Sequence, residues 1–145
     1  VPRRARPGLA RPGASASRGE VSFAESVENG RAKKTYSPTD AGRTAFFAWL
    51  TGPITGSELE TQALARCFFL GLLADDAARR TVLDNIIERT EADEAELLAV
   101  AGHLDALEVP AELAGVFRFQ RATLEYGLKS LRLGAEHFTA LRDAL

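Results

Sequence analysis

The chain has one cysteine and no long apolar run, and both scarcities narrow the class of protein it can be. Cys67 alone cannot form an internal disulfide, so we expect a small buried thiol in a reducing, cytoplasmic compartment. The longest apolar run covers residues 67–74. A bilayer needs roughly 20 apolar residues, so we expect no transmembrane helix and no membrane partner.

Histidine is nearly as scarce, which bears on catalysis and metal binding. The only two, His103 and His137, fall on different predicted helices and have no suitably spaced acid or nucleophile beside them. The acidic cluster over residues 88–96 lacks the Glu-x-x-His spacing of di-iron bundles and is better explained as a solvated helix face. We therefore predict no catalytic residues, no metal and no cofactor, and do not expect an enzyme.

The composition is that of a soluble globular protein, with 145 residues, 46% hydrophobic and 26% charged. The charge is unevenly shared. Residues 1–43 hold nine of the 18 Lys and Arg but only four of the 20 Asp and Glu. A basic N-terminal part followed by an acidic C-terminal part is typical of a protein that binds nucleic acid through its N-terminal domain. A solvated Arg-rich tail would give the same charge distribution.

A β-hairpin is predicted over residues 20–37, around Asn29-Gly30. An Asn-Gly pair between alternating runs favours a two-residue turn, because both central residues need positive φ. Such a turn places Glu28 opposite Arg31 and Phe23 opposite Tyr36. One face then carries the apolar residues, which we expect to pack on helices: Val21, Phe23, Val27, Ala32 and Tyr36.

Four basic residues, Arg31, Lys33, Lys34 and Arg43, are the candidate DNA-binding set. A cationic hairpin tip can lie along phosphates, as the wing of a winged helix does. The competing interpretation is a cross-strand salt-bridge set with Glu25 and Glu28, and the sequence leaves both open.

Proline and glycine divide the chain into three segments. Residues 1–19 are predicted as a disordered Arg/Pro/Gly-rich arm, 20–52 as a hairpin plus linking helix, and 53–145 as a helical domain. The linking helix starts at Thr39 or Asp40 and ends near Leu50, with Phe46, Phe47 and Trp49 expected in the core.

Three further helices are predicted. One is capped by Ser57 and runs to about Leu73, with an inward stripe of Ala63, Leu64, Cys67, Phe68 and Leu72. Residues 76–107 contain no proline and predict one long helix with a near-heptad seam interrupted at Thr90 and Glu94. A last helix, from Pro110 to about Ala144, should pair antiparallel with it.

These helices carry more apolar residues than one copy can cover, so we expect a homodimer. The candidate dimer or ligand-pocket residues are Phe117, Leu124, Leu131 and Phe138. Phe138, near the end of the last helix, fits either a core position or a small-molecule pocket between two copies.

The stretch Lys33-Lys34-Thr35-Tyr36-Ser37-Pro38-Thr39-Asp40-Ala41-Gly42-Arg43 with Trp49-Leu50 resembles the wing-to-helix junction of PadR-like transcriptional regulators. Pro38 stands where that pattern usually has leucine. The segment Arg66-Cys67-Phe68-Phe69-Leu70, the long acidic helix and the ending residues 131–138 resemble that family's C-terminal dimerisation domain.

The resemblance implies a mainly α fold: the β-hairpin wing of a truncated winged helix, then a dimerisation domain of long antiparallel helices. It also implies a cytoplasmic homodimeric repressor that binds operator DNA and can respond to a small-molecule effector. The helix-turn-helix that precedes the wing in such proteins is largely absent here, so we expect a truncated DNA-reading head. The alternative is a helical dimerisation or protein-interaction module without its own DNA binding.

Overall fold

The computed structural model describes residues 18–28 and 30–145. The chain divides into two compact units, residues 1–52 and 53–145, which we describe separately. The disordered arm predicted over residues 1–19 lies, except for its last two residues, outside the described part of the chain.

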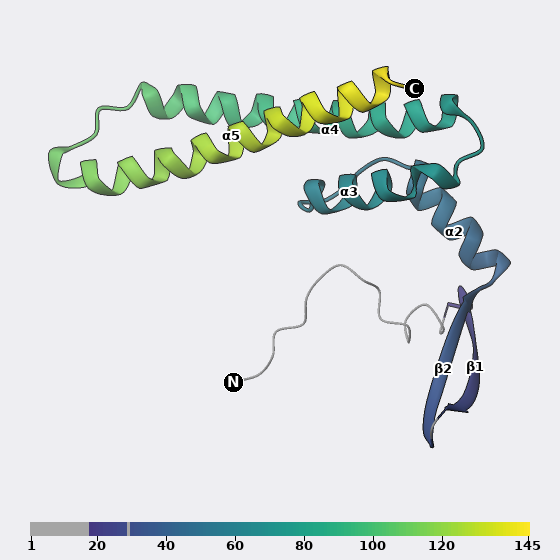
Figure 1. Cartoon of the computed structure of the whole chain (residues 1–145). Helices are drawn as coiled ribbons and strands as arrows, with labels where there is room; N and C mark the ends of the chain where they lie inside the picture. Colours follow the sequence, from purple (N-terminus) through teal and green to yellow (C-terminus); the bar gives the residue numbers. More distant parts are fainter. Residues whose placement is uncertain (1–17, 29) are drawn as a thin grey trace. The chain divides into compact units, whose positions relative to one another are not determined.

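The first unit contains the predicted hairpin (Figure 1). Strand β1, Val21–Glu28, pairs antiparallel with β2, Arg31–Pro38. The pairs Phe23 with Tyr36 and Glu28 with Arg31 confirm the register expected from the sequence. Gly30 has φ of 76°, the positive value that a tight turn requires. Its predicted companion in the turn, Asn29, is not among the described residues.

Helix α2, Asp40–Thr51, begins at the predicted position, because Thr39 closes its first turn. The Thr39 Oγ1 accepts a hydrogen bond from the Gly42 N–H at 3.1 Å and donates one to the Gly19 carbonyl oxygen at 2.7 Å. The Thr39 N–H also donates to the carbonyl oxygen of Glu20, at 3.0 Å. One threonine therefore caps the helix and ties it to the start of β1.

Two packing expectations for this unit are wrong. Phe23 and Tyr36 are 49% and 43% exposed, so the apolar hairpin face is not covered by helices. Phe47 and Trp49 are also exposed, and of the predicted aromatic core only Phe46 is half-buried. The aromatic rings of α2 contact one another instead: the ring centroid of Phe46 lies 5.4 Å from that of Phe47 and 5.8 Å from that of Trp49.

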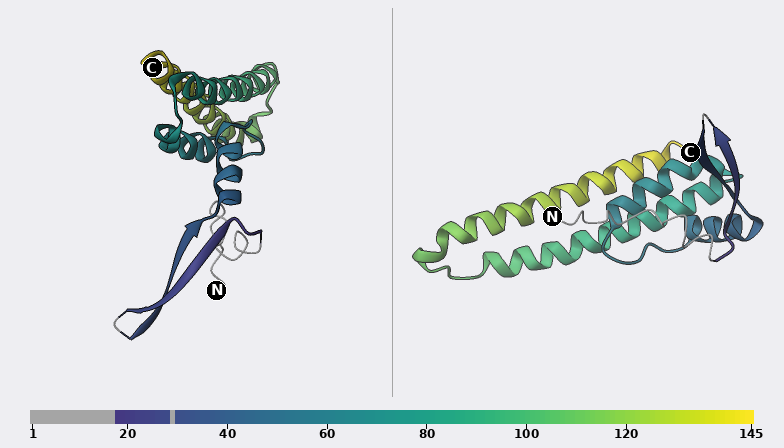
Figure 2. Two further views of the ribbon diagram at one scale, coloured as in Figure 1. Left: turned by 90° about the vertical axis from the view of Figure 1, so that its right-hand side faces the viewer. Right: turned by 90° about the horizontal axis from the view of Figure 1, so that it is seen from below.

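The second unit is helical. Helix α3 covers Leu59–Phe69 and ends in a 3-10 turn, Leu70–Leu72. Helix α4 covers Asp76–Asp105, and a second 3-10 turn, Ala111–Leu113, leads into α5, Ala114–Asp143. Helices α4 and α5 lie side by side and antiparallel in both views, which confirms the predicted pair (Figures 1 and 2).

The core of this unit gathers on the first half of α4. Its buried apolar residues are Ile54, Leu59, Ala63, Leu70, Leu73, Val82, Leu83, Ile86, Ile87, Ala101 and Phe138. The two polar interruptions in the α4 seam each have a partner. The Thr90 hydroxyl donates to the Ile86 carbonyl oxygen at 2.7 Å, and the Glu94 carboxylate accepts from Arg132 of α5 at 3.0 Å.

Helix α3 departs from the sequence prediction at its start and on its inner face. It begins at Leu59, and no side chain caps it, so the predicted Ser57 cap is wrong. Leu64 is 54% and Phe68 82% exposed, whereas Arg66 is buried. The Arg66 guanidinium donates to the Pro53 carbonyl oxygen at 3.0 Å, and burial lowers its pKa. Arg66, with its long aliphatic chain and hydrogen-bonded guanidinium, is therefore buried where the apolar pattern predicted Leu64 and Phe68.

Candidate nucleic-acid interface and helical groove

The basic residues of the hairpin divide between its two faces. Lys33 alternates with Lys34 along β2, so their side chains point to opposite sides of the sheet. The Lys33 ammonium lies 2.5 Å from the Glu28 carboxylate, and the Lys34 ammonium lies 3.0 Å from that of Glu25. Lys34 also stands over the Phe23 ring, 4.5 Å from its centroid. The cross-strand ion pairs considered from the sequence are therefore both present.

These ion pairs leave the lysines available to a stronger anion. Every side chain in them is at least half exposed to solvent, and such surface pairs are worth between about 0 and 1 kcal/mol. The hydrogen bond and charge of Glu25 raise the pKa of Lys34, so it stays cationic at neutral pH. Arg31, exposed beside the turn, forms no ion pair within residues 18–28 and 30–145. The hairpin therefore carries two exposed cations, Arg31 and Lys33, on one face and a third, Lys34, on the other.

Arg43, the fourth predicted residue, is not on the hairpin. It lies in the first turn of α2, and its Nε is 3.5 Å from the Asp40 carboxylate in an exposed pair. A basic side chain at a helix start is poorly placed for the helix dipole. Asp40 in the same turn offsets that cost, because its carboxylate pairs with Arg43. The pair therefore has a local structural role at the start of α2.

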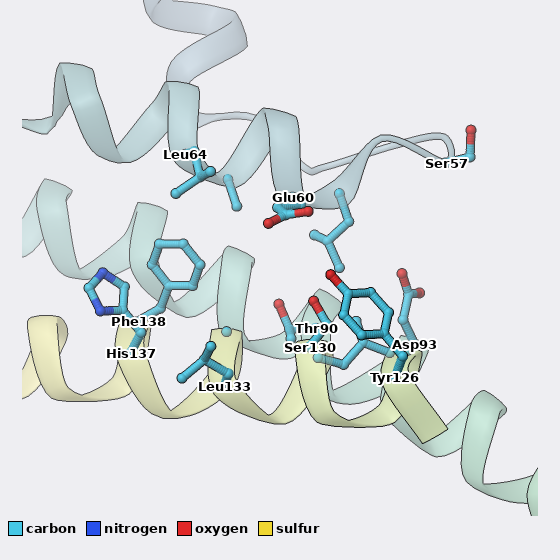
Figure 3. A pocket seen from close by; sticks show the side chains of 15 residues that line it. Ser57, Glu60, Leu64, Thr90, Asp93, Tyr126, Ser130, Leu133, His137 and Phe138 are labelled. Carbon is cyan, nitrogen blue, oxygen red and sulfur yellow. The ribbon is translucent and has the colours of Figure 1, made fainter. Parts of the chain in front are cut away.

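A groove of about 450 Å³ opens in the second unit between α3 and the α4–α5 pair (Figure 3). Side chains from α3 and α5 project into the space between these two helices. The lining residues are Ser57, Leu59, Glu60, Ala63, Leu64, Thr90, Asp93, Tyr126, Gly127, Ser130, Leu131, Leu133, Gly134, His137 and Phe138.

The groove brings together only part of the residue set predicted for a dimer or ligand pocket. Leu131 and Phe138 line it, and Phe138 is buried. Phe117 and Leu124 are half-buried residues of α5 that do not line it. The prediction followed one stripe of α5, whereas the groove is lined by the C-terminal part of that stripe and equally by the neighbouring stripe with Tyr126 and Leu133.

Two of the polar side chains that line the groove, Asp93 and Thr90, are committed to the fold. Asp93 accepts a hydrogen bond from the Arg89 guanidinium at 2.7 Å, and the Thr90 hydroxyl is bonded within α4. No group of three His, Cys, Asp or Glu that could hold a metal occurs within the described part of the chain. In that same part, no helix is both long and apolar enough to cross a membrane. The groove wall carries several large apolar side chains, among them Leu64, Leu133 and Phe138.

The comparison with solved structures gives a fold likeness. PadR of Bacillus subtilis, crystallised in complex with operator DNA, superposes with a TM-score of 0.51 over 92% of this chain and 74% of that chain, at 16% identity. The protein smu.1604c of Streptococcus mutans UA159 has a TM-score of 0.42 over 94% of this chain and 78% of that chain, at 20% identity. No family model and no curated protein matches. The first likeness shows that the chain has a PadR-like fold: mainly helical, with a two-stranded hairpin before long C-terminal helices.

Proposed function

We propose that this chain is a PadR-like transcriptional regulator that binds DNA as a homodimer. The observation that carries the proposal is the fold likeness, over 92% of the chain, to a regulator solved on its operator DNA. The cationic hairpin gives the likeness a chemical basis, because Arg31, Lys33 and Lys34 lie within four positions of each other at an exposed turn. Arg43 is a fourth candidate contact.

The hairpin would act on the DNA backbone. Side chains at its tip exchange their carboxylate partners for phosphate oxygens, and the counterions released from the DNA drive binding. Contacts of this kind fix the orientation of a protein on the duplex but do not distinguish one base sequence from another. The role we assign to these residues is therefore affinity and positioning.

A second candidate function is a helical interaction module that does not bind DNA. One observation favours it: the two lysines of the hairpin already have partners, Glu28 and Glu25, on the neighbouring strand. In that case the basic residues serve only to hold the strands together. A small-molecule effector, which the family resemblance implies, would find an apolar site in the groove around Phe138.

Fluorescence anisotropy with a labelled duplex at low salt separates the two functions. We expect the intact chain to bind, and the triple variant Arg31→Gln, Lys33→Gln, Lys34→Gln to lose at least about tenfold in affinity. The control of equal charge is the triple variant Arg118→Gln, Lys129→Gln, Arg132→Gln, which removes three exposed cations of α5. Equal losses in both variants would mean that only net charge matters, and no binding by the intact chain would favour the interaction module.

A further inference from the structure

The two faces of the hairpin differ in chemistry. Successive residues of a strand point to opposite faces and directly paired residues share a face, so the register of β1 and β2 assigns every side chain. One face, which we call the polar face, carries Ser22, Ala24, Ser26, Glu28, Arg31, Lys33, Thr35 and Ser37. The other, which we call the apolar face, carries Val21, Phe23, Glu25, Val27, Ala32, Lys34, Tyr36 and Pro38.

On the apolar face, the single lysine is committed to its neighbours. The Lys34 ammonium pairs with the Glu25 carboxylate at 3.0 Å and lies 4.5 Å from the centroid of the Phe23 ring. The Phe23 ring in turn lies 5.9 Å from that of Tyr36. Charge on this face is balanced, and Val27, 76% exposed near the turn, adds apolar surface that gains nothing from a phosphate. Lys34 therefore serves to join the two strands.

The polar face has more positive than negative charge. Arg31 and Lys33 stand against one carboxylate, that of Glu28, which pairs with Lys33. Ser26 lies directly opposite Lys33, and Thr35 follows on the same face, farther from the turn. Short hydroxyl side chains let phosphate oxygens come close to the strands and can donate hydrogen bonds to them.

The spacing of this face also suits a nucleic-acid backbone. Arg31, Lys33 and Thr35 alternate along β2, so their positions are about 6.7 Å apart. Each strand of duplex DNA carries one phosphate for about every 3.4 Å of the helix axis. The three side chains can therefore reach several consecutive phosphates of one strand.

We propose that the DNA backbone lies along the polar face alone, and that Glu28 competes with it for Lys33. Arg31 and Lys33 supply the charge contacts, and Ser26 and Thr35 donate hydrogen bonds to phosphate oxygens. Glu28 limits the affinity, because a phosphate must displace its carboxylate from Lys33. This inference rests on the proposed DNA binding and deepens it, since it assigns the contacts to one face and gives the protein a built-in competitor.

Matched single variants on opposite faces test the proposal. Lys33→Gln and Lys34→Gln make the same change of charge, and anisotropy titrations with a labelled duplex at several salt concentrations compare them. We expect Lys33→Gln to lower the magnitude of the salt slope by about 1 and Lys34→Gln to leave the slope unchanged. Glu28→Gln should tighten binding by about two- to fivefold, because an exposed ion pair no longer has to break. Glu25→Gln, with the same change of net charge, should leave the affinity unchanged.

A second matched pair leaves the ion pairs of the hairpin in place. Ser26→Asp and Ala32→Asp each add a carboxylate near the turn, the first on the polar face and the second on the apolar face. We expect Ser26→Asp to weaken binding by at least about tenfold and Ala32→Asp by no more than about twofold. Amide hydrogen exchange over residues 20–38 checks that the hairpin is intact, and where a variant opens it, the other pairs decide.

The outcomes separate this inference from the proposed function. Equal effects of two matched variants, or a larger effect on the apolar face, would overturn the assignment to the polar face while DNA binding stands. Unchanged affinity in Glu28→Gln would overturn its role as a competitor. An intact chain that binds no duplex would overturn both the inference and the proposed function.

Discussion

The backbone of Gly42 lies directly against the carbonyl oxygen of Glu20, so closely that a Cβ on Gly42 would overlap that oxygen. The contact joins the first turn of α2 to the residue that precedes β1. Both groups are backbone, so neither can turn aside as a flexible side chain would. The helix and the base of the hairpin are thus held together at a point where only glycine fits.

Gly42→Ala should therefore loosen the hairpin base. Overpacking of this kind costs about 1–3 kcal/mol. Amide hydrogen exchange over residues 20–38 should become faster in the variant. The control is Gly102→Ala on α4, where a new Cβ meets nothing within 4 Å, and which should leave exchange over 20–38 unchanged. Unchanged exchange in Gly42→Ala would contradict the close contact.

Thr39→Ala removes both hydrogen bonds of the Thr39 hydroxyl: the one accepted from the Gly42 N–H, which caps α2, and the one donated to the Gly19 carbonyl oxygen, just before β1. The loss of an N-cap of this type costs about 1 kcal/mol. Because the chain has a single tryptophan, Trp49 on α2, a urea titration followed by its fluorescence reports on this unit. We expect a lower midpoint for Thr39→Ala and near-normal behaviour for Thr39→Ser, which keeps the hydroxyl. A low midpoint in both variants would mean that the hydroxyl is not what matters.

Leu83→Ala should destabilise the helical unit strongly. Leu83 is fully buried on α4, and truncating a buried leucine costs about 2–5 kcal/mol. Leu98→Ala, on the same helix but 46% exposed, should change the free energy of unfolding by less than about 0.5 kcal/mol. Urea unfolding followed by circular dichroism measures both. Similar values for the two variants would place the core elsewhere.

Burial raises the pKa of the Cys67 thiol, so at neutral pH it holds its proton more firmly than an exposed cysteine does. Because alkylation needs the thiolate, iodoacetamide should modify Cys67 more slowly in the folded chain than in urea. The difference should narrow as the pH rises through the raised pKa. Equal rates in the folded and unfolded chains at neutral pH would show that the thiol is not shielded.

The sequence predicted those parts of the fold that depend on local chemistry. The hairpin register followed from the turn at Gly30 and from strand alternation, and the long α4–α5 pair followed from the absence of proline over residues 76–107. The inner face of α3 could not be predicted, because a buried Arg66 replaces an apolar residue there. The sequence also predicted the candidate site only in part. The basic tip was visible in the sequence, but its pairing with Glu25 and Glu28 left its role open.

The stripe of α5 with Tyr126 and Leu133, which lines the groove, was not predicted for a related reason. Ser130 and His137 interrupt it, so the apolar pattern pointed instead to the stripe with Phe117 and Leu124. Only the structure shows that residues of both stripes, Leu131 with Phe138 and Tyr126 with Leu133, line one groove. A count of apolar residues cannot separate two seams on one helix when one of them is partly polar.

The salt dependence of DNA binding tests the central claim most directly. For duplex DNA, the logarithm of the affinity falls with the logarithm of salt concentration by about 0.9 for each phosphate contact. We expect a steep negative slope for the intact chain and, for the variant Arg31→Gln, Lys33→Gln, Lys34→Gln, a slope smaller in magnitude by about 2 to 3. Identical slopes for the two proteins, or no DNA binding by the intact chain at any salt concentration, would contradict it.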